Sequence, residues 1–207
     1  MGQMMLALMI VPLGLFVMKC IKEKYIFSPL ITLSCMAIAL LSGAHGRAFV
    51  CAAYVFSVIG DFFLAHKDIH KDSYLFGIGG FFLAHTGFLL YALTNSEITW
   101  ITYALAGILM VPYGFYLIRK LYPALHNLPM QIAVSLYMLI SLAVFSCAFS
   151  MSGDASNKIV FILGIGMILF SDTVISVSDF LGNRKWDGFI LPTYYLCHIL
   201  VCLSTVL

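Results

Sequence analysis

The hydrophobic residues of this chain fall into eight long runs separated by short polar segments. A membrane-spanning helix needs about 20 mostly apolar residues, with a range of about 17–25, and each run is long enough. Open strands cannot satisfy their backbone hydrogen bonds in lipid, so we expect helices. The pattern predicts an all-α fold, a polytopic membrane bundle of about eight transmembrane helices, with residues 1–207 as a single integral membrane domain. The predicted helices are 3–19, 28–44, 48–65, 74–93, 98–118, 130–149, 158–179 and 189–207.

The composition supports this interpretation and excludes several classes of protein. Hydrophobic residues make up 62% of the chain, charged residues make up 10%, and the mean hydropathy is +1.03. A soluble domain is typically about 45–50% apolar and about 25% charged. An ordinary soluble enzyme, a disordered chain and a fibrous protein are therefore excluded. Basic residues form no patch with interleaved aromatics, so we expect no nucleic-acid partner.

The basic residues predict how the chain is oriented in its membrane. Loops after odd-numbered helices and the adjoining helix ends hold nine of them, whereas the other loops hold only Arg47 and Lys158. Short loops rich in Lys and Arg stay in the cytoplasm, so we expect both termini outside it. The membrane would be the plasma or inner membrane of a bacterium, or the endoplasmic reticulum of a eukaryote. The nine residues are Lys19, Lys22, Lys24, Lys67, Lys71, Arg119, Lys120, Arg184 and Lys185.

Ionisable residues inside the predicted helices are the main functional signal. A charge near the bilayer centre costs at least about 2.5–3.5 kcal/mol, so such residues usually face a cavity, a partner or a substrate. Asp61, His85, Asp172 and His198 lie inside four different helices, at related depths in the cytoplasmic half. No Lys or Arg is expected at the same depth to neutralise them. Asp179 lies at a helix end beside Arg184 and Lys185 and is interpreted as an interfacial residue.

Glycines inside the apolar runs have a simpler interpretation. Gly77, Gly79 and Gly80 share one predicted helix, and Gly164 and Gly166 share another. Small residues let membrane helices approach closely, so we expect these positions to mark helix contacts rather than a phosphate-binding loop.

Four short motifs, in this order along the chain, resemble a known family. They are Gly60-Asp61-Phe62-Phe63-Leu64, Phe81-Phe82-Leu83-Ala84-His85, Phe170-Ser171-Asp172 and Tyr194-Tyr195. Together with the length and the helix count, they resemble the YhhN-like lysoplasmalogenase family of eight-helix membrane proteins. One departure is Ser28-Pro29, where the family has a Lys-Pro step.

The resemblance implies hydrolysis of the vinyl ether bond of a lysoplasmalogen to a fatty aldehyde and a glycerophospho-ethanolamine or -choline. It also implies catalysis by two aspartates, which match Asp61 and Asp172, and no cofactor. Enol ethers hydrolyse through protonation of a vinyl carbon, so one carboxyl would act as the acid. With both carboxyls expected in one poorly solvated pocket, we assign Asp172 as the acid and Asp61 as the carboxylate that stabilises the cation and orients water. The reverse assignment is the alternative, because coupled carboxyls titrate as a unit. Supporting residues are expected at His85, Ser171, Tyr194, Tyr195 and His198.

The expected partner is a lysophospholipid that enters from the inner leaflet, with membrane lipid around the bundle. Its tail would lie among Phe62, Phe63, Phe81 and Phe82, and its phosphate would lie near the basic cytoplasmic rim at Lys67, Lys71, Arg184 or Lys185. Two alternatives use the same residues. One is a metal-dependent lipid hydrolase, with Asp61, His85, Asp172 and His198 as zinc ligands. The other is a proton-coupled transporter or lipid-binding protein.

Overall fold

The computed structural model describes residues 2–22, 26–67, 69, 72–125 and 127–207. Over these residues the chain is helical, and the only strand-like feature is an isolated bridge between Ser96 and Met151. The long helices are α2 (Ile10–Lys22), α3 (Phe27–Ser42), α4 (Arg47–Ala65), α5 (Ser73–Thr94), α6 (Trp100–Tyr116), α8 (Leu128–Ala148), α9 (Ala155–Leu181) and α10 (Ile190–Ser204). Shorter segments are α1 (Gly2–Leu8), a π-helical turn η1 (Leu117–Leu121), α7 (Tyr122–Ala124) and a 3₁₀ turn η2 (Arg184–Phe189).

All eight predicted runs are helical, which confirms the all-α membrane fold. Within the described residues, seven helical segments are long and apolar enough to cross a membrane, and α3, with 16 residues, is shorter. The first run is interrupted at Met9, between α1 and α2, and the fifth ends in η1 and α7. The chain is therefore a multi-pass membrane protein.

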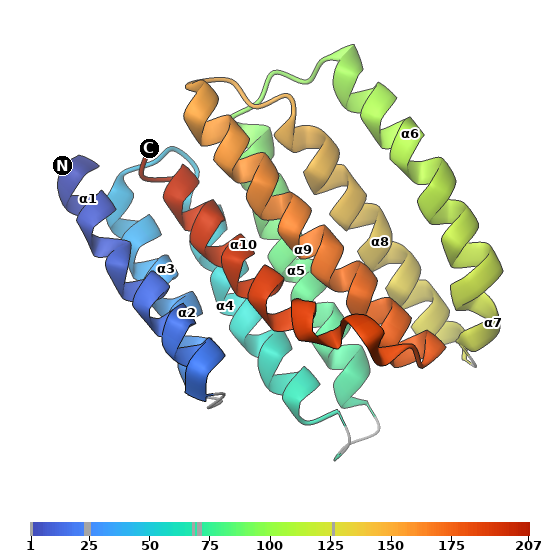
Figure 1. Cartoon of the computed structure of the whole chain (residues 1–207). Helices are drawn as coiled ribbons and strands as arrows, with labels where there is room; N and C mark the ends of the chain where they lie inside the picture. Colours follow the sequence, from blue (N-terminus) through green and yellow to red (C-terminus); the bar gives the residue numbers. More distant parts are fainter. Residues whose placement is uncertain (1, 23–25, 68, 70–71, 126) are drawn as a thin grey trace.

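The helices form two layers, as Figure 1 shows. In this view α2, α10 and α9 lie in front, α3, α4, α5 and α8 lie behind them, and α6 lies at one edge. The most extensive helix pairs are α4 with α5 and α9 with α10. Both chain termini lie at the same end of the bundle.

Glycines set the closest approach between α4 and α5. A Cβ on Gly80 would lie 2.9 Å from the Cα and N atoms of Gly60, and one on Gly77 would lie 2.6 Å from the side chain of Leu64. Gly164 likewise packs against α10, with Val201 at 3.1 Å. These contacts confirm the predicted packing role. Gly79 is an exception, because nothing lies within 4 Å of its Cβ position and it faces an open groove.

Asp179 lies at the end of α9, where an ion pair joins the two layers. Lys67, just after α4, lies 2.7 Å from its Oδ2 atom, and the Tyr74 hydroxyl donates to the same oxygen at 3.1 Å. Both charged side chains are partly exposed, at 33% and 20%. Asp179 is thus a residue of the bundle end, as expected, although its partner is Lys67 rather than Arg184 or Lys185. Lys24 and Lys71 lie outside the described residues.

Candidate functional site

The polar side chains predicted to carry function lie between the two helix layers. Asp61 and His85 come from α4 and α5, and Asp172 and His198 come from α9 and α10. Both histidines are fully buried. The helices that carry these residues are held in place by apolar contacts around them, including the Tyr54 and Phe88 rings. The residues form two groups, one around each aspartate.

Asp172 has two partners on the opposite layer. The Tyr137 hydroxyl on α8 donates a hydrogen bond of 2.6 Å to its Oδ2 atom. The Nε2 atom of His85 lies 3.6 Å from the same oxygen. The Asp172 side chain is 18% exposed, and it borders a cavity of about 60 Å³ between α6, α8 and α9. We call Asp172, Tyr137 and His85 the Asp172 centre.

The hydrogen bonds of the two histidines identify which ring nitrogen carries the proton. His85 Nδ1 lies 3.0 Å from the Phe81 carbonyl oxygen, and His198 Nδ1 lies 2.9 Å from the Tyr194 carbonyl oxygen. A carbonyl oxygen only accepts, so each Nδ1–H is the donor, and each neutral ring presents a lone pair at Nε2. Neither Nε2 atom has a hydrogen-bond partner among the described residues.

The lone pair at Nε2 of His85 therefore faces a carboxyl oxygen of Asp172. Two acceptors repel each other unless one of them carries a proton. A proton on the Asp172 carboxyl, or a second proton on the His85 ring, turns the contact into an attractive one. The Asp172 centre can thus hold one proton between the buried His85 ring and the largely buried Asp172 carboxyl, with the Tyr137 hydroxyl as a donor beside it.

Asp61 has a different set of neighbours. The Tyr194 hydroxyl on α10 lies beside its carboxyl, and Ser57, one turn before Asp61 on α4, lies beside the Tyr194 hydroxyl. Among the described residues, the Ser57 hydroxyl, the Tyr194 hydroxyl and Asp61 Oδ2 are buried without a hydrogen bond of good geometry. Lys19 near the end of α2 is only 7% exposed and acts electrostatically on Asp61. The expectation that no basic residue neutralises these aspartates is therefore wrong for Asp61, because α2 brings Lys19 within its electrostatic reach.

His198 connects the two groups. Its ring lies 4.5 Å from the Tyr194 ring and 5.4 Å from the Tyr54 ring, measured between centroids. The Tyr54 hydroxyl donates to the His198 carbonyl oxygen at 2.8 Å. His198 also acts electrostatically on His85. A series of polar and aromatic groups therefore runs from Asp61 to Asp172, in the order Tyr194, His198, Tyr54, Phe88 and His85.

The remaining predicted residues have mainly structural contacts. Tyr195 is buried within electrostatic reach of Asp61, and its ring packs against Tyr194. The Ser171 hydroxyl donates to the Ile190 carbonyl oxygen at 3.1 Å and so holds the start of α10 against α9. Ser171 thus positions α10 rather than contributing a group to the Asp172 centre.

The proposed zinc ligands do not converge on one point. Among the described residues, no three His, Cys, Asp or Glu side chains lie close enough together to hold a metal ion. His85 approaches Asp172 alone, while Asp61 and His198 have other neighbours. The four-residue ligand set considered for a metal-dependent hydrolase is therefore not assembled.

Comparison with known protein families gives one match. Residues 23–205 match the YhhN family, which covers every residue of both groups except Lys19. The chain belongs to the YhhN family. No curated protein and no solved structure matches it significantly. Membership of the YhhN family confirms the resemblance inferred from the four motifs and is consistent with a membrane hydrolase.

Sequence reasoning missed several residues at the centre of this YhhN family member. Tyr137 gives no functional signal in the sequence, because a tyrosine in an apolar run is usually a packing residue. Ser57 had a detectable signal, since it lies four residues before Asp61 and so on the same helix face. The sequence places Lys19 at a helix end, and nothing in the local sequence shows that it is buried within electrostatic reach of Asp61.

Proposed function

We propose that this chain is a lysoplasmalogenase, which hydrolyses the vinyl ether bond of a lysoplasmalogen at the Asp172 centre. The observation that carries the proposal is the contact of one carboxyl oxygen with both the Tyr137 hydroxyl and His85 Nε2. Hydrolysis of a vinyl ether starts with transfer of a proton to carbon, so it needs a positioned acid. A buried carboxyl that shares a proton with a neighbour can supply one.

The reaction follows from this assignment. Protonated Asp172 transfers its proton to the outer vinyl carbon, which leaves the Asp172 carboxylate beside an oxocarbenium ion. Water adds to the cationic carbon and loses a proton to the neutral Nε2 atom of His85, which forms a hemiacetal. The hemiacetal then gives its hydroxyl proton to the Asp172 carboxylate, its bond to the glycerol oxygen breaks, and the protonated His85 ring gives its proton to that oxygen. The products are a fatty aldehyde and a glycerophospho-alcohol, and the Asp172 centre regains its starting protons.

Asp61 has a supporting role in this scheme. Its own partners are Tyr194 and Lys19, and Tyr194 leads to His198 and on to His85. Charges act over long distances in a poorly solvated interior, so the Asp61 carboxylate can stabilise positive charge at the Asp172 centre without touching the substrate. This modifies the simpler scheme in which two adjacent carboxyls share one pocket.

The substrate that fits this scheme is a single-chain phospholipid taken from the inner leaflet. The proposal keeps both termini outside the cytoplasm, which places the basic helix ends, including Lys67 and Arg119, at the cytoplasmic surface. The membrane would be the plasma or inner membrane in a bacterium, or the endoplasmic reticulum in a eukaryote.

The experiment is an aldehyde-release assay on the purified protein in detergent. A vinyl ether lysophospholipid should yield aldehyde, whereas the alkyl ether analogue should yield none. Asp172→Asn should lower kcat by at least about 100-fold, as expected for loss of a general acid. Asp179→Asn on the same helix is the matched control, because its carboxyl pairs with Lys67 away from the centre, and it should keep its activity. Full activity of Asp172→Asn would refute the mechanism.

A further inference from the structure

A small cavity lies between α6, α8 and α9, beside Asp172, and both apolar and hydroxyl-bearing side chains line it. Its volume is about 60 Å³, room for a few groups the size of a water molecule. Hydroxyl groups from all three helices border it together with the Asp172 carboxyl. The lining residues are Tyr113, Tyr116, Leu121, Val134, Tyr137, Met138, Ser141, Leu169, Asp172, Thr173 and Ser176.

Two pairs of hydroxyls close the seam between α6 and α9. The Tyr116 hydroxyl lies 2.9 Å from Ser176 Oγ, and the Tyr113 hydroxyl lies 3.2 Å from Thr173 Oγ1. Each pair is three residues from the other on both helices, so the pairs lie one above the other. The Tyr116–Ser176 pair lies nearer the end of α6, and the Tyr113–Thr173 pair lies nearer Asp172, which directly precedes Thr173 in α9. Each of these hydroxyls can leave its partner and form a hydrogen bond with a polar group of a ligand instead.

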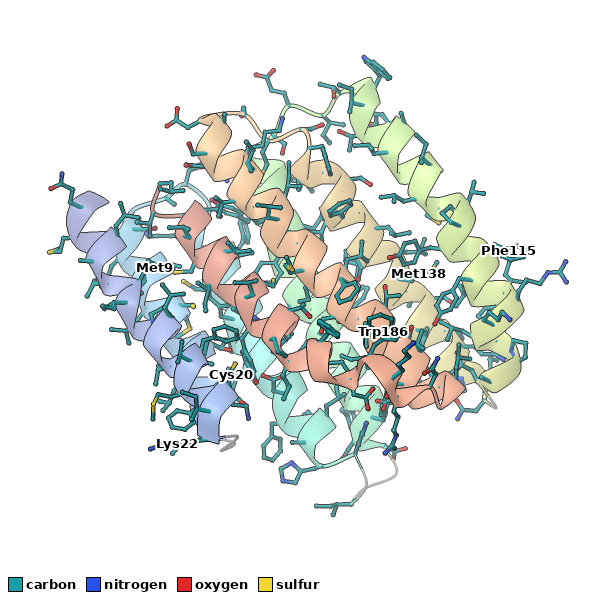
Figure 2. The ribbon with its side chains drawn as sticks, viewed as in Figure 1. Met9, Cys20, Lys22, Phe115, Met138 and Trp186 are labelled. Carbon is teal, nitrogen blue, oxygen red and sulfur yellow. The ribbon has the colours of Figure 1, made fainter. Side chains whose placement is uncertain are left out.

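The seam adjoins both lipid and a basic helix end. The outer side of α6 is exposed, as at Val111 (74%) and Phe115 (64%). In Figure 2, Phe115 lies on that outer side, whereas Met138 lies between α6 and α9. Arg119 and Lys120 are exposed on η1, directly after the end of α6. A ligand at the seam would therefore meet lipid, positive charge and hydroxyl groups within a short distance.

We propose that the seam between α6 and α9 binds the glycerophosphate end of a single-chain phospholipid and delivers its ether bond to Asp172. Arg119 and Lys120 attract the phosphate, and the two hydroxyl pairs bind the glycerol oxygens. Ser176 and Asp172 are four residues apart on α9, about 6 Å along its axis, which suits an extended glycerol backbone. This inference rests on the proposed function and names the route of its substrate. It replaces the route among the phenylalanines near Lys67, because Phe81 is packed against Gly60 and Tyr194.

The larger groove of the molecule does not suit the polar end of a lipid. It has a volume of about 460 Å³ and lies between α4 and α5. Every lining residue is apolar or a glycine: Phe56, Ile59, Phe63, Leu75, Phe76, Gly79, Gly80 and Leu83. Asp61 lies two residues after Ile59 and two before Phe63, on the opposite face of α4 from that groove.

A blocking substitution tests the route. Ser176→Trp fills the seam beside Tyr116 and should lower kcat/KM for the vinyl ether lysolipid by about 100-fold. Leu163→Trp is the matched control, because it adds the same side chain to a lipid-exposed position of α9, and it should keep its activity. Thermal unfolding of both variants identifies any misfolding. Full activity of a folded Ser176→Trp variant would overturn the proposal.

Ligand protection provides a readout that does not depend on catalysis. In a Cys20→Ser background, Ser176→Cys is treated with a small cationic methanethiosulfonate, with and without the non-hydrolysable alkyl ether lysolipid. Lipid at ten times its dissociation constant should slow modification of the introduced thiol about tenfold, whereas modification of Leu163→Cys should be unaffected. Equal modification rates of the Ser176→Cys variant with and without lipid would refute the site, even if Ser176→Trp is inactive. Protection without aldehyde release by the unsubstituted protein would instead refute the proposed hydrolysis and keep the lipid site.

Discussion

The contact between Gly80 and Gly60 makes a sharp prediction about the stability of the bundle. In Gly80→Ala, the new Cβ would lie 2.9 Å from the Gly60 backbone and 3.3 Å from the Phe56 carbonyl oxygen. These atoms belong to the backbone of α4, so they cannot rotate away as a flexible side chain would. The helices would have to move apart by about 0.5 Å to restore an ordinary contact of 3.4 Å. Overpacking of this kind costs about 1–3 kcal/mol.

Gly79→Ala is the matched control for this substitution. Gly79 precedes Gly80 in the same helix, but nothing lies within 4 Å of its Cβ position. Alanine favours a helix over glycine by about 0.8–1.0 kcal/mol, so this variant should be as stable as the unsubstituted protein or more stable. The two variants make the same chemical change, and the difference between them isolates the contact between α4 and α5.

Thermal unfolding of the purified protein in detergent measures the difference. For a chain of this size, 1 kcal/mol corresponds to a change in Tm of about 2–4 °C. Both variants gain the same helix preference, so the Tm of Gly80→Ala should lie about 2–12 °C below that of Gly79→Ala, and Gly79→Ala should not lower Tm. A Tm of Gly80→Ala equal to or above that of Gly79→Ala would refute the close crossing of the two helices. It would also undermine the placement of Asp61 relative to His85, which depends on that crossing.

Further predictions concern the two aspartates and their partners. Tyr137→Phe removes the hydrogen bond to Asp172 and should lower kcat about tenfold with little change in KM; an unchanged kcat would show that this bond does not govern the acid. Asp61→Asn should lower kcat about tenfold, less than Asp172→Asn, and equal losses in the two variants would instead support direct participation of both carboxyls. Lys67→Gln breaks a partly exposed ion pair with Asp179, worth about 0–1 kcal/mol, so Tm should fall by no more than about 4 °C. Aldehyde release should persist after treatment with a metal chelator, and its loss with recovery on adding zinc would contradict the mechanism.

The eight helices and the main polar residues could be predicted from the sequence. Insertion into a bilayer depends on the hydrophobicity of each segment, which is a local property of the chain. For the same reason Asp61, His85, Asp172 and His198 were recognisable, since each is an exception within an apolar run. Gly77 and Gly80 likewise indicated a helix contact, because small residues within one apolar run are typical of closely packed membrane helices.

The grouping of these residues could not be predicted in the same way. The sequence predicts a pair of carboxyls in one pocket, yet Asp172 contacts Tyr137 and His85, while Asp61 lies beside Tyr194 and within electrostatic reach of Lys19. Which residue of a helix faces which neighbour depends on the rotation and crossing of both helices, and those depend on packing along their whole length.

Hydrophobicity along the chain was thus sufficient to predict the membrane fold and the short set of candidate residues. The free-energy cost of placing a charge in lipid is a property of each single residue, so it can be read from the sequence. The pairing of Asp172 with Tyr137 and His85, the burial of Lys19 and the hydroxyl-lined seam emerged only when the helices were packed together. Contacts across helices join residues far apart in the chain, and steric fit at positions such as Gly60 and Gly80 selects among the many packings that the same hydrophobic pattern allows.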